Sequence, residues 1–249
     1  MLGQDVSLFA YALVALASFV AAIVGGVAGY GTGLLLPPVL VPIIGAEAVV
    51  PVIAVSALMT NGSRLIAFRT YFDAPRAVIV TAAALPSCLL GAYLYTRLSG
   101  PHVAVLIGAV LILLVPVRRI LLRRRGHLPN KGVAAAGAAY GLLVGGTTGS
   151  GVVLLSILLA AGLQGPVVIA TDAGISLMLG VAKTLMFQSA GALPLAAWIM
   201  AAVVGVAAIP GAFIARRVAH RLSLRAHTTI LDAVVILGGG LLIVQGLLG

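Results

Sequence analysis

The apolar and polar positions of the chain fall into long blocks. Five stretches carry no charged residue, and they extend over residues 6–46, 77–96, 98–117, 132–171 and 184–215. Because about 20 apolar residues cross the hydrocarbon core of a bilayer, each stretch is long enough for at least one crossing. The pattern predicts an all-α polytopic membrane protein.

Ten helical segments follow when proline, glycine and charged residues are taken as boundaries. They lie near residues 6–24, 33–44, 48–68, 77–96, 102–117, 132–146, 151–162, 166–187, 194–215 and 228–248. At 1.5 Å per residue, the second and the seventh are too short to cross the bilayer. We therefore expect two short broken or re-entrant helices, which are tolerated where protein or a cavity covers the exposed backbone.

Composition agrees with a membrane protein. Of 249 residues, 62% are hydrophobic and 8% are charged, with a mean hydropathy of +1.23, and no soluble core could cover that much apolar surface. The N-terminus lacks a basic region and a small-residue cleavage site, so we expect no signal peptide. The lone Cys88 excludes an internal disulfide and a thiolate cluster. The four histidines lack metal-ligand spacing within a span, so we expect no metal and no cofactor.

The basic residues predict the orientation. Arg69 and Arg76, the segment 118–131 and the segment 216–225 all fall on one side of a ten-segment chain, whereas Arg97 marks the other. The positive-inside rule places the three basic loops in the cytoplasm and both termini outside. The same loops could touch anionic lipid headgroups. No nucleic-acid-binding motif accompanies them, so we expect no nucleic-acid partner.

Two glycine-rich stretches lie 120 positions apart, GGVAGYGTG from Gly25 and GGTTGSG from Gly145. After a one-residue gap, Arg64 also matches Lys183. Each half holds five segments, an odd number, so the second half enters from the opposite side. We predict two inverted repeats, residues 1–117 and 132–249, joined by a basic cytoplasmic linker at 118–131. Paired helix breaks in corresponding halves are the best sequence indication of a transporter's substrate site.

The breaks are suited to binding an anion. Glycine lets the backbone approach a ligand, and the N-terminus of the following helix offers free N–H groups and a positive dipole. The predicted cradle consists of Gly29, Tyr30, Gly31, Thr32, Thr147, Thr148, Gly149, Ser150 and Gly151. The alternative is that these glycines only allow close helix packing, as small residues do in membranes.

Arg64 and Lys183 are the cations that fall inside predicted spans. A charge near the bilayer centre costs at least ~2.5 kcal/mol, so it usually faces a cavity or a partner. Asn61 shares a helical face with Arg64, and Ser176 shares one with Lys183. We assign all four to the substrate site. The alternative is that both cations extend to the membrane surface from nearby helix ends.

Asp172 is the carboxylate well inside a predicted helix. It could take up protons and couple transport to them, or it could neutralise Lys183 or Arg64. A structural position near the cytoplasmic end of the helix is the other reading. Trp198, Tyr93 and Tyr95 lie near predicted interfaces, where aromatic residues form belts.

Three segments together resemble the sulfite exporter TauE/SafE family, also called the 4-toluene sulfonate uptake permease family. They are GGVAGYGTGLLLPPVLV from Gly25, GGTTGSGVVLLSILL from Gly145 and IATDAGISLM from Ile169. The resemblance implies movement of sulfite, sulfonates such as sulfoacetate, or related organic anions across the inner membrane. Where many members carry a Thr-Ser pair, this chain has Thr171 and Asp172.

The sequence therefore favours a secondary transporter, acting in export, for small sulfur-containing anions. An anion channel and a permease for a non-sulfur organic anion are the alternatives. Titratable groups inside the spans are too scarce for an enzyme, and no nucleotide-binding motif occurs. The sequence leaves open whether the chain forms a homodimer.

Overall fold

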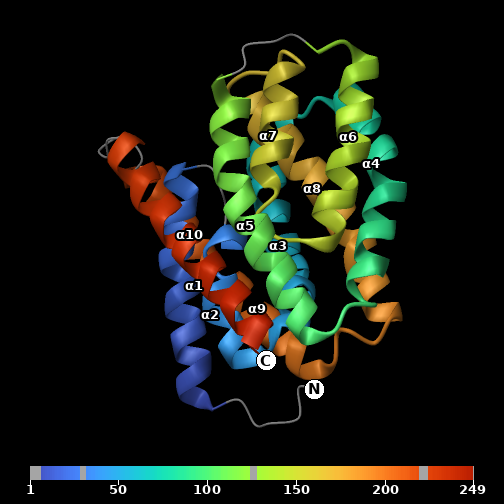
Figure 1. Ribbon diagram of the computed structural model, residues 1–249. Helices are drawn as coiled ribbons and strands as arrows, with labels where there is room; N and C mark the ends of the chain where they lie inside the picture. The colour runs from blue at the N-terminus through green and yellow to red at the C-terminus, as the bar shows by residue number, and fades with distance from the viewer. Residues whose placement is uncertain (1–6, 29–31, 124–127, 219–223, 249) are drawn as a thin grey trace.

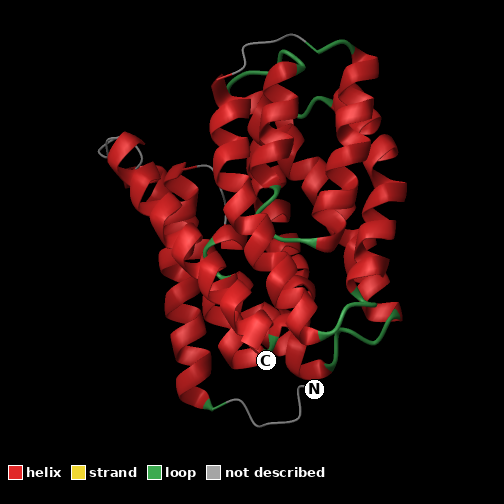
Figure 2. Cartoon of the chain, in the orientation of Figure 1, coloured by secondary structure: helices red, strands yellow, loops and turns green. Residues whose placement is uncertain are grey.

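The computed structural model describes residues 7–28, 32–123, 128–218 and 224–248, and in these ranges every regular element is a helix (Figures 1 and 2). The ten α-helices match the ten predicted segments, so the all-α prediction is confirmed. They are α1 (Leu8–Ala28), α2 (Pro37–Ile44), α3 (Ala46–Phe68), α4 (Ala74–Tyr95), α5 (Gly100–Arg123), α6 (Asn130–Gly146), α7 (Gly151–Ala160), α8 (Pro166–Ser189), α9 (Leu195–Val218) and α10 (Leu224–Leu248). Two 3-10 helices, η1 (Thr32–Leu34) and η2 (Arg69–Tyr71), precede α2 and α4.

The helix boundaries follow from local chemistry. Proline occupies one of the first two positions of α2, α4 and α8, where its missing N–H is not needed and its fixed φ suits the helix. The Asp73 carboxylate accepts a hydrogen bond from the backbone N–H of Arg76 and caps α4, because a side-chain oxygen there satisfies an unpaired donor. The start of α8 at Pro166 is as predicted, whereas α5 runs to Arg123, beyond the predicted end at 117, and α10 begins at Leu224, before the predicted start at 228.

Hydropathy and length give four clear membrane-span candidates among the described residues. They are Ala46–Tyr71, Ala74–Tyr95, Gly100–Val117 and Pro166–Ser189. Large apolar side chains are also exposed on several helices, including Ile66 of α3 at 72%, Phe213 of α9 at 67% and Leu237 of α10 at 74%. Exposed apolar surface of this kind marks contact with lipid or with another protein.

Both short helices are present, with 8 residues in α2 and 10 in α7. The second forms a hairpin with α6, because the N–H of Leu128, just before α6, donates to the carbonyl of Ala160 at the end of α7 over 2.7 Å. The chain therefore turns back between Gly146 and Gly151, inside the molecule. Figure 1 shows α7 at the upper end of the molecule and α2 toward the lower end.

Helix packing forms two bundles that meet along α3 and α8. In one, α1 packs on α9 and α3 packs on α9; in the other, α4 packs on α6 and on α8. The helices α3 and α8 pack on each other, and α5 packs on α10. The contact between α4 and α6 is close because glycines at 137, 141 and 145 face the backbone of α4, as small residues do at helix interfaces in membranes.

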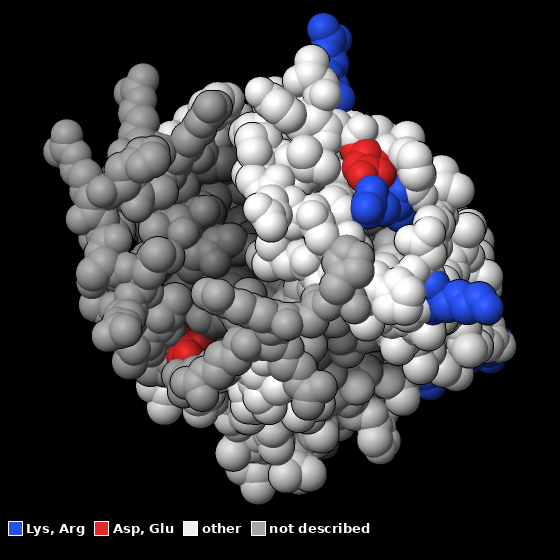
Figure 3. Space-filling model, turned by 90° about the horizontal axis from the view of Figure 1, so that it is seen from above, with Lys and Arg blue, Asp and Glu red and all other residues white. Residues whose placement is uncertain are grey.

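The upper end in Figure 1 carries several charged side chains. Seen from above, it shows blue Lys and Arg side chains and a red acidic group beside one of them (Figure 3). The helix ends that meet there include the end of α3 and the start of α8, which are joined by the pair Arg64–Asp172. Arg97 lies instead after α4, close to the start of α3, which Tyr95 contacts.

Candidate functional site

The two glycine-rich breaks touch each other. The Thr148 hydroxyl, between α6 and α7, donates to the carbonyl of Gly33 in η1 over 2.6 Å. A Cβ atom on Gly33 would lie 2.9 Å from the backbone nitrogen of Gly149, closer than real Cβ contacts. Gly149 itself has φ +77°, a conformation that side chains disfavour. The breaks of the two halves are therefore one structural unit.

The hydroxyl groups of the second break are buried and partly engaged. Thr147, Thr148 and Ser150 are 5%, 5% and 2% exposed. The Thr147 hydroxyl donates to the carbonyl of Leu143 and the Thr148 hydroxyl to that of Gly33. Ser150 precedes α7 without a side-chain capping bond. An anion at this point would therefore meet backbone N–H groups first, because two of the predicted hydroxyl donors already serve carbonyls.

Lys183 caps the C-terminal end of α6. Its ammonium group donates to the carbonyls of Val144 and Thr147 over 2.6 and 2.9 Å, and the residue is 6% exposed. The last carbonyls of a helix lack internal partners, and a cation there also suits the negative end of the helix dipole. Two of the three ammonium donors are used in this way, which leaves one for a further acceptor. The reading that Lys183 extends to the membrane surface is wrong, because the group is buried at the break.

Arg64 and Asp172 form an ion pair between α3 and α8. Arg64 Nη2 lies 3.0 Å from Asp172 Oδ2, and Arg64 Nη1 donates to Asn61 Oδ1 over 3.3 Å. Asp172 Oδ1 is buried and has no hydrogen-bond partner. Beside the pair, the backbone N–H of Asp73 donates to the Thr171 hydroxyl over 3.1 Å. Of the readings for Asp172, the structure supports neutralisation of Arg64 in a buried position.

The two predicted cations do not share one pocket. Eleven residues of the continuous helix α8 separate Asp172, the partner of Arg64, from Lys183. At 1.5 Å per residue, this is about 16 Å along the helix axis. The predicted site thus divides into the ion pair near one end of the bundle and the glycine breaks with Lys183 farther along.

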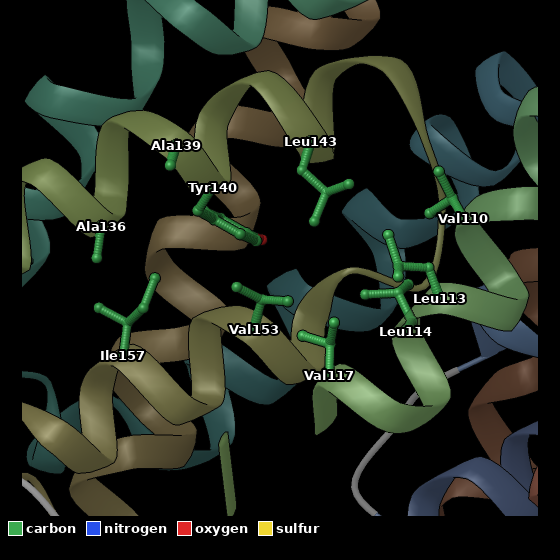
Figure 4. A pocket seen from close by; sticks show the side chains of 10 residues that line it. All are labelled: Val110, Leu113, Leu114, Val117, Ala136, Ala139, Tyr140, Leu143, Val153 and Ile157. Carbon is green, nitrogen blue, oxygen red and sulfur yellow. The ribbon is translucent and has the colours of Figure 1, made fainter. Parts of the chain in front are cut away.

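A cavity that the sequence did not indicate lies between α5, α6 and α7. Its volume is about 310 Å³, and Tyr140, Leu143 and Val153 are part of its wall (Figure 4). The remaining lining residues are Val110, Leu113, Leu114, Val117, Ala136, Ala139 and Ile157. The Tyr140 hydroxyl lies near the side chains of Ser150 and Ser176. Tyr140 thus lies near both the predicted donor Ser176 and the second break, and a single tyrosine in an alanine- and glycine-rich helix did not indicate this position.

The first break is described only in part. Gly29, Tyr30 and Gly31 lie outside the described residues, and of Thr32 only the backbone in η1 is described. Gly151 begins α7 and is partly exposed. Within the described ranges, no group of three or more His, Cys, Asp or Glu residues is arranged to hold a metal ion.

The aromatic residues at the predicted interfaces differ from one another. Trp198 donates to Gln188 Oε1 over 2.9 Å and is partly exposed, and Arg97 donates to the exposed Tyr93 hydroxyl over 2.8 Å. Tyr95, in contrast, is 3% exposed and donates to the carbonyl of Ala46 over 2.9 Å. The prediction that Tyr95 is a belt residue is wrong, because its side chain lies in the core at the junction of α3 and α4.

Comparison with known proteins gives one match. The sequence model of the sulfite exporter TauE/SafE family matches residues 14–242, nearly the whole chain. Neither the curated proteins nor the solved structures give a significant match. The match covers both breaks, the ion pair and Lys183, and the described residues hold four clear membrane-span candidates. The chain is therefore a multi-pass membrane transport protein that belongs to the sulfite exporter TauE/SafE family.

Proposed function

We propose that this chain is a secondary transporter that exports small sulfur-containing anions, such as sulfoacetate, other organosulfonates or sulfite, across the cell inner membrane. Family membership supports a transporter of sulfur-containing anions. The observation that carries the proposal is the contact between the two breaks, where Thr148 bonds to Gly33. Broken helices that meet inside a bundle are where secondary transporters place their substrate site.

The packing pattern supports two inverted repeats. In the proposed repeats, α1 to α5 correspond in order to α6 to α10, so that α1 corresponds to α6 and α4 to α9. The contact of α1 with α9 then becomes that of α6 with α4, and the contact of α3 with α9 becomes that of α8 with α4. The contact of α2 with α10 likewise becomes that of α7 with α5. In the proposed mechanism, one half rocks against the other and exposes the breaks to each side in turn.

The anion site in this proposal is centred on the breaks. Backbone N–H groups at the start of α7 supply the positive end of a helix dipole, and the third donor of Lys183 adds a charge at the end of α6. A sulfonate or sulfite group offers three acceptor oxygens, which suits several convergent donors. Arg64, whose side chain is 42% exposed, gives a second contact on the path of the anion.

The proposed orientation follows from the basic loops. Arg69, Arg76 and the linker 118–131 face the cytoplasm in this assignment, and both termini lie outside. An uncoupled anion would then be driven outward by the inside-negative potential, by about 2.3 kcal/mol per charge and 100 mV. The basic loops are also placed to touch the headgroups of the cytoplasmic leaflet.

Proteoliposomes loaded with a labelled anion test the proposal. Flux is compared for sulfite, sulfoacetate, taurine, thiosulfate and sulfate, first for the wild-type protein and then for Arg64→Ala and Lys183→Ala. Arg97→Ala serves as the matched control because Arg97 contacts Tyr93 at the surface. We expect saturable flux with counterflow, reduced by both substitutions and unchanged by the control. Large single-channel currents would favour a channel instead, and no flux of any of these anions would refute the proposal.

A further inference from the structure

The carboxylate of Asp172 is held on one side only. Its Oδ2 atom accepts a hydrogen bond from Arg64, while Oδ1 is buried without a partner. The side chain of Asp172 is 10% exposed, whereas that of Arg64 is 42% exposed. A buried ionised carboxylate normally requires hydrogen bonds to both oxygens. Oδ1 of Asp172 is therefore free to take up a proton, and the side chain of its partner Arg64 is accessible to solvent.

Lys183 differs from Arg64 in the partner that neutralises it. The ammonium group is bound by the carbonyls of Val144 and Thr147, which do not titrate. Arg64, at the matching position of the other half, is neutralised by a carboxylate, which a proton can discharge. Protonation can therefore discharge the partner of Arg64 but not the partners of Lys183.

We propose that Asp172 takes up a proton at Oδ1 when a transported anion displaces its Oδ2 from Arg64, so that a proton travels with each anion. This inference rests on the proposed function and changes what drives export: because the proton cancels the charge of the anion, export then follows the concentration gradients of the anion and the proton and not the membrane potential. The proton comes from water on the side where the anion enters and forms an O–H bond on Asp172. It returns to water on the opposite side, after the anion has left the protein there and Arg64 binds Oδ2 again. No oxidation or reduction takes place.

Charge conservation at the site supports this exchange. In the empty state the pair holds one positive and one negative charge, which sum to zero. In the loaded state Arg64 faces the anion and Asp172 is neutral, so one positive and one negative charge again sum to zero. Without the proton, two negative groups would compete for one guanidinium inside the membrane, where an unbalanced charge is costly.

The groups around Asp172 allow this role. Arg64 faces it from α3, and Tyr140 lies near it on α6. At the start of α4, Asp73 is already paired with Arg76 over 2.7 Å. Farther along α4, the neighbouring titratable group is the buried Cys88. Arg64 is therefore the charged group in direct contact with Asp172 among the described residues, and the charge that an incoming anion would engage.

Proton movement coupled to anion movement tests the inference. Proteoliposomes contain a trapped pH-sensitive dye, and labelled sulfoacetate or sulfite enters under an acid-outside gradient. For the wild-type protein we expect one proton per anion and accumulation driven by the gradient. For Asp172→Asn we expect counterflow to continue while proton movement and gradient-driven accumulation are lost. Asp73→Asn, which keeps the helix cap and lies at the same end, should behave like the wild type.

The outcomes separate the two proposals. Anion flux without proton movement in the wild-type protein, or unchanged proton movement in Asp172→Asn, would overturn the inference and leave the transporter assignment intact. No flux of any anion in the panel would refute the proposed function itself. Asp172→Glu provides a second variant if the asparagine protein is not monodisperse. It keeps a titratable group and should keep proton movement, so its loss there would also contradict the role of Asp172.

Discussion

Replacing Lys183 by methionine should destabilise the fold, because the carbonyls at the C-terminal end of α6 lose their hydrogen-bond donor. The ammonium group is buried and donates to two carbonyls at the break. Methionine has a similar length and keeps most of the apolar packing around the side chain, including contact near the ring of Phe187, above which the ammonium lies at 5.7 Å. The substitution therefore tests the two hydrogen bonds and not the volume of the side chain.

The magnitude follows from the carbonyls that lose their donor. Each buried polar group without a partner costs about 1–3 kcal/mol, so two carbonyls cost about 2–6 kcal/mol. Removing the ammonium relieves its own desolvation and offsets part of this cost. We therefore expect a loss of about 2–4 kcal/mol in the free energy of unfolding. For a chain of this length, this corresponds to a fall of roughly 5–15 °C in the melting temperature.

Thermal unfolding of the purified protein in detergent measures this change. Lys131→Met is the matched control, because Lys131 is the other lysine of the chain and lies exposed in the first turn of α6. The control should melt within about 1–2 °C of the wild type, since exposed substitutions usually change stability by under 0.5 kcal/mol. Equal melting temperatures for the two variants would refute the assignment of Lys183 as the group that caps α6.

Three further predictions concern the breaks and the ion pair. Thr148→Val, which keeps the shape and loses the bond to the Gly33 carbonyl, should cost about 1 kcal/mol in stability and slow anion flux in proteoliposomes. Gly33→Ala should abolish flux because its Cβ atom would meet the opposite break, whereas Gly62→Ala, with no atom within 4 Å of the added Cβ, should leave flux unchanged. Arg64→Gln should lower the unfolding free energy by about 2–3 kcal/mol, because it leaves the buried carboxylate of Asp172 without its partner. Asp172→Asn should cost about 1 kcal/mol, because it leaves the half-exposed guanidinium of Arg64. Calorimetry measures the order, and the double variant Arg64→Gln/Asp172→Asn should recover part of the loss.

The helices could be predicted from the sequence because their boundaries depend on local chemistry. Proline at the starts of α2 and α8, and glycine at Gly45 and Gly165 with φ of +78° and +58°, mark ends that need no knowledge of the rest of the chain. The short length of α2 and α7 followed in the same way. Their direction did not, because the return of α7 alongside α6 depends on a contact between Leu128 and Ala160, which are distant in sequence.

The site was predicted at the level of residues but not of partners. Glycine spacing indicated that the breaks correspond to each other, yet it could not show that Thr148 bonds to Gly33. The burial of Lys183 likewise depends on where α6 ends, a tertiary feature. The sequence did not indicate Tyr140 or the cavity of about 310 Å³ beside it, because a cavity depends on how α5, α6 and α7 pack against one another.

The different neutralisation of Arg64 and Lys183 explains how a fold with matched halves can treat its two cations differently. Lys183 holds the second break through carbonyls that cannot be discharged, so its loss should act first on stability. Asp172 holds Arg64 through one oxygen of a carboxylate, so its neutralisation should act first on coupling. The two effects must therefore separate. A Lys183→Met protein should be less stable but still move one proton per anion, whereas an Asp172→Asn protein should melt near the wild type but move no protons. If both variants lost stability and coupling together, the two cations would belong to one structural unit and this division would be wrong.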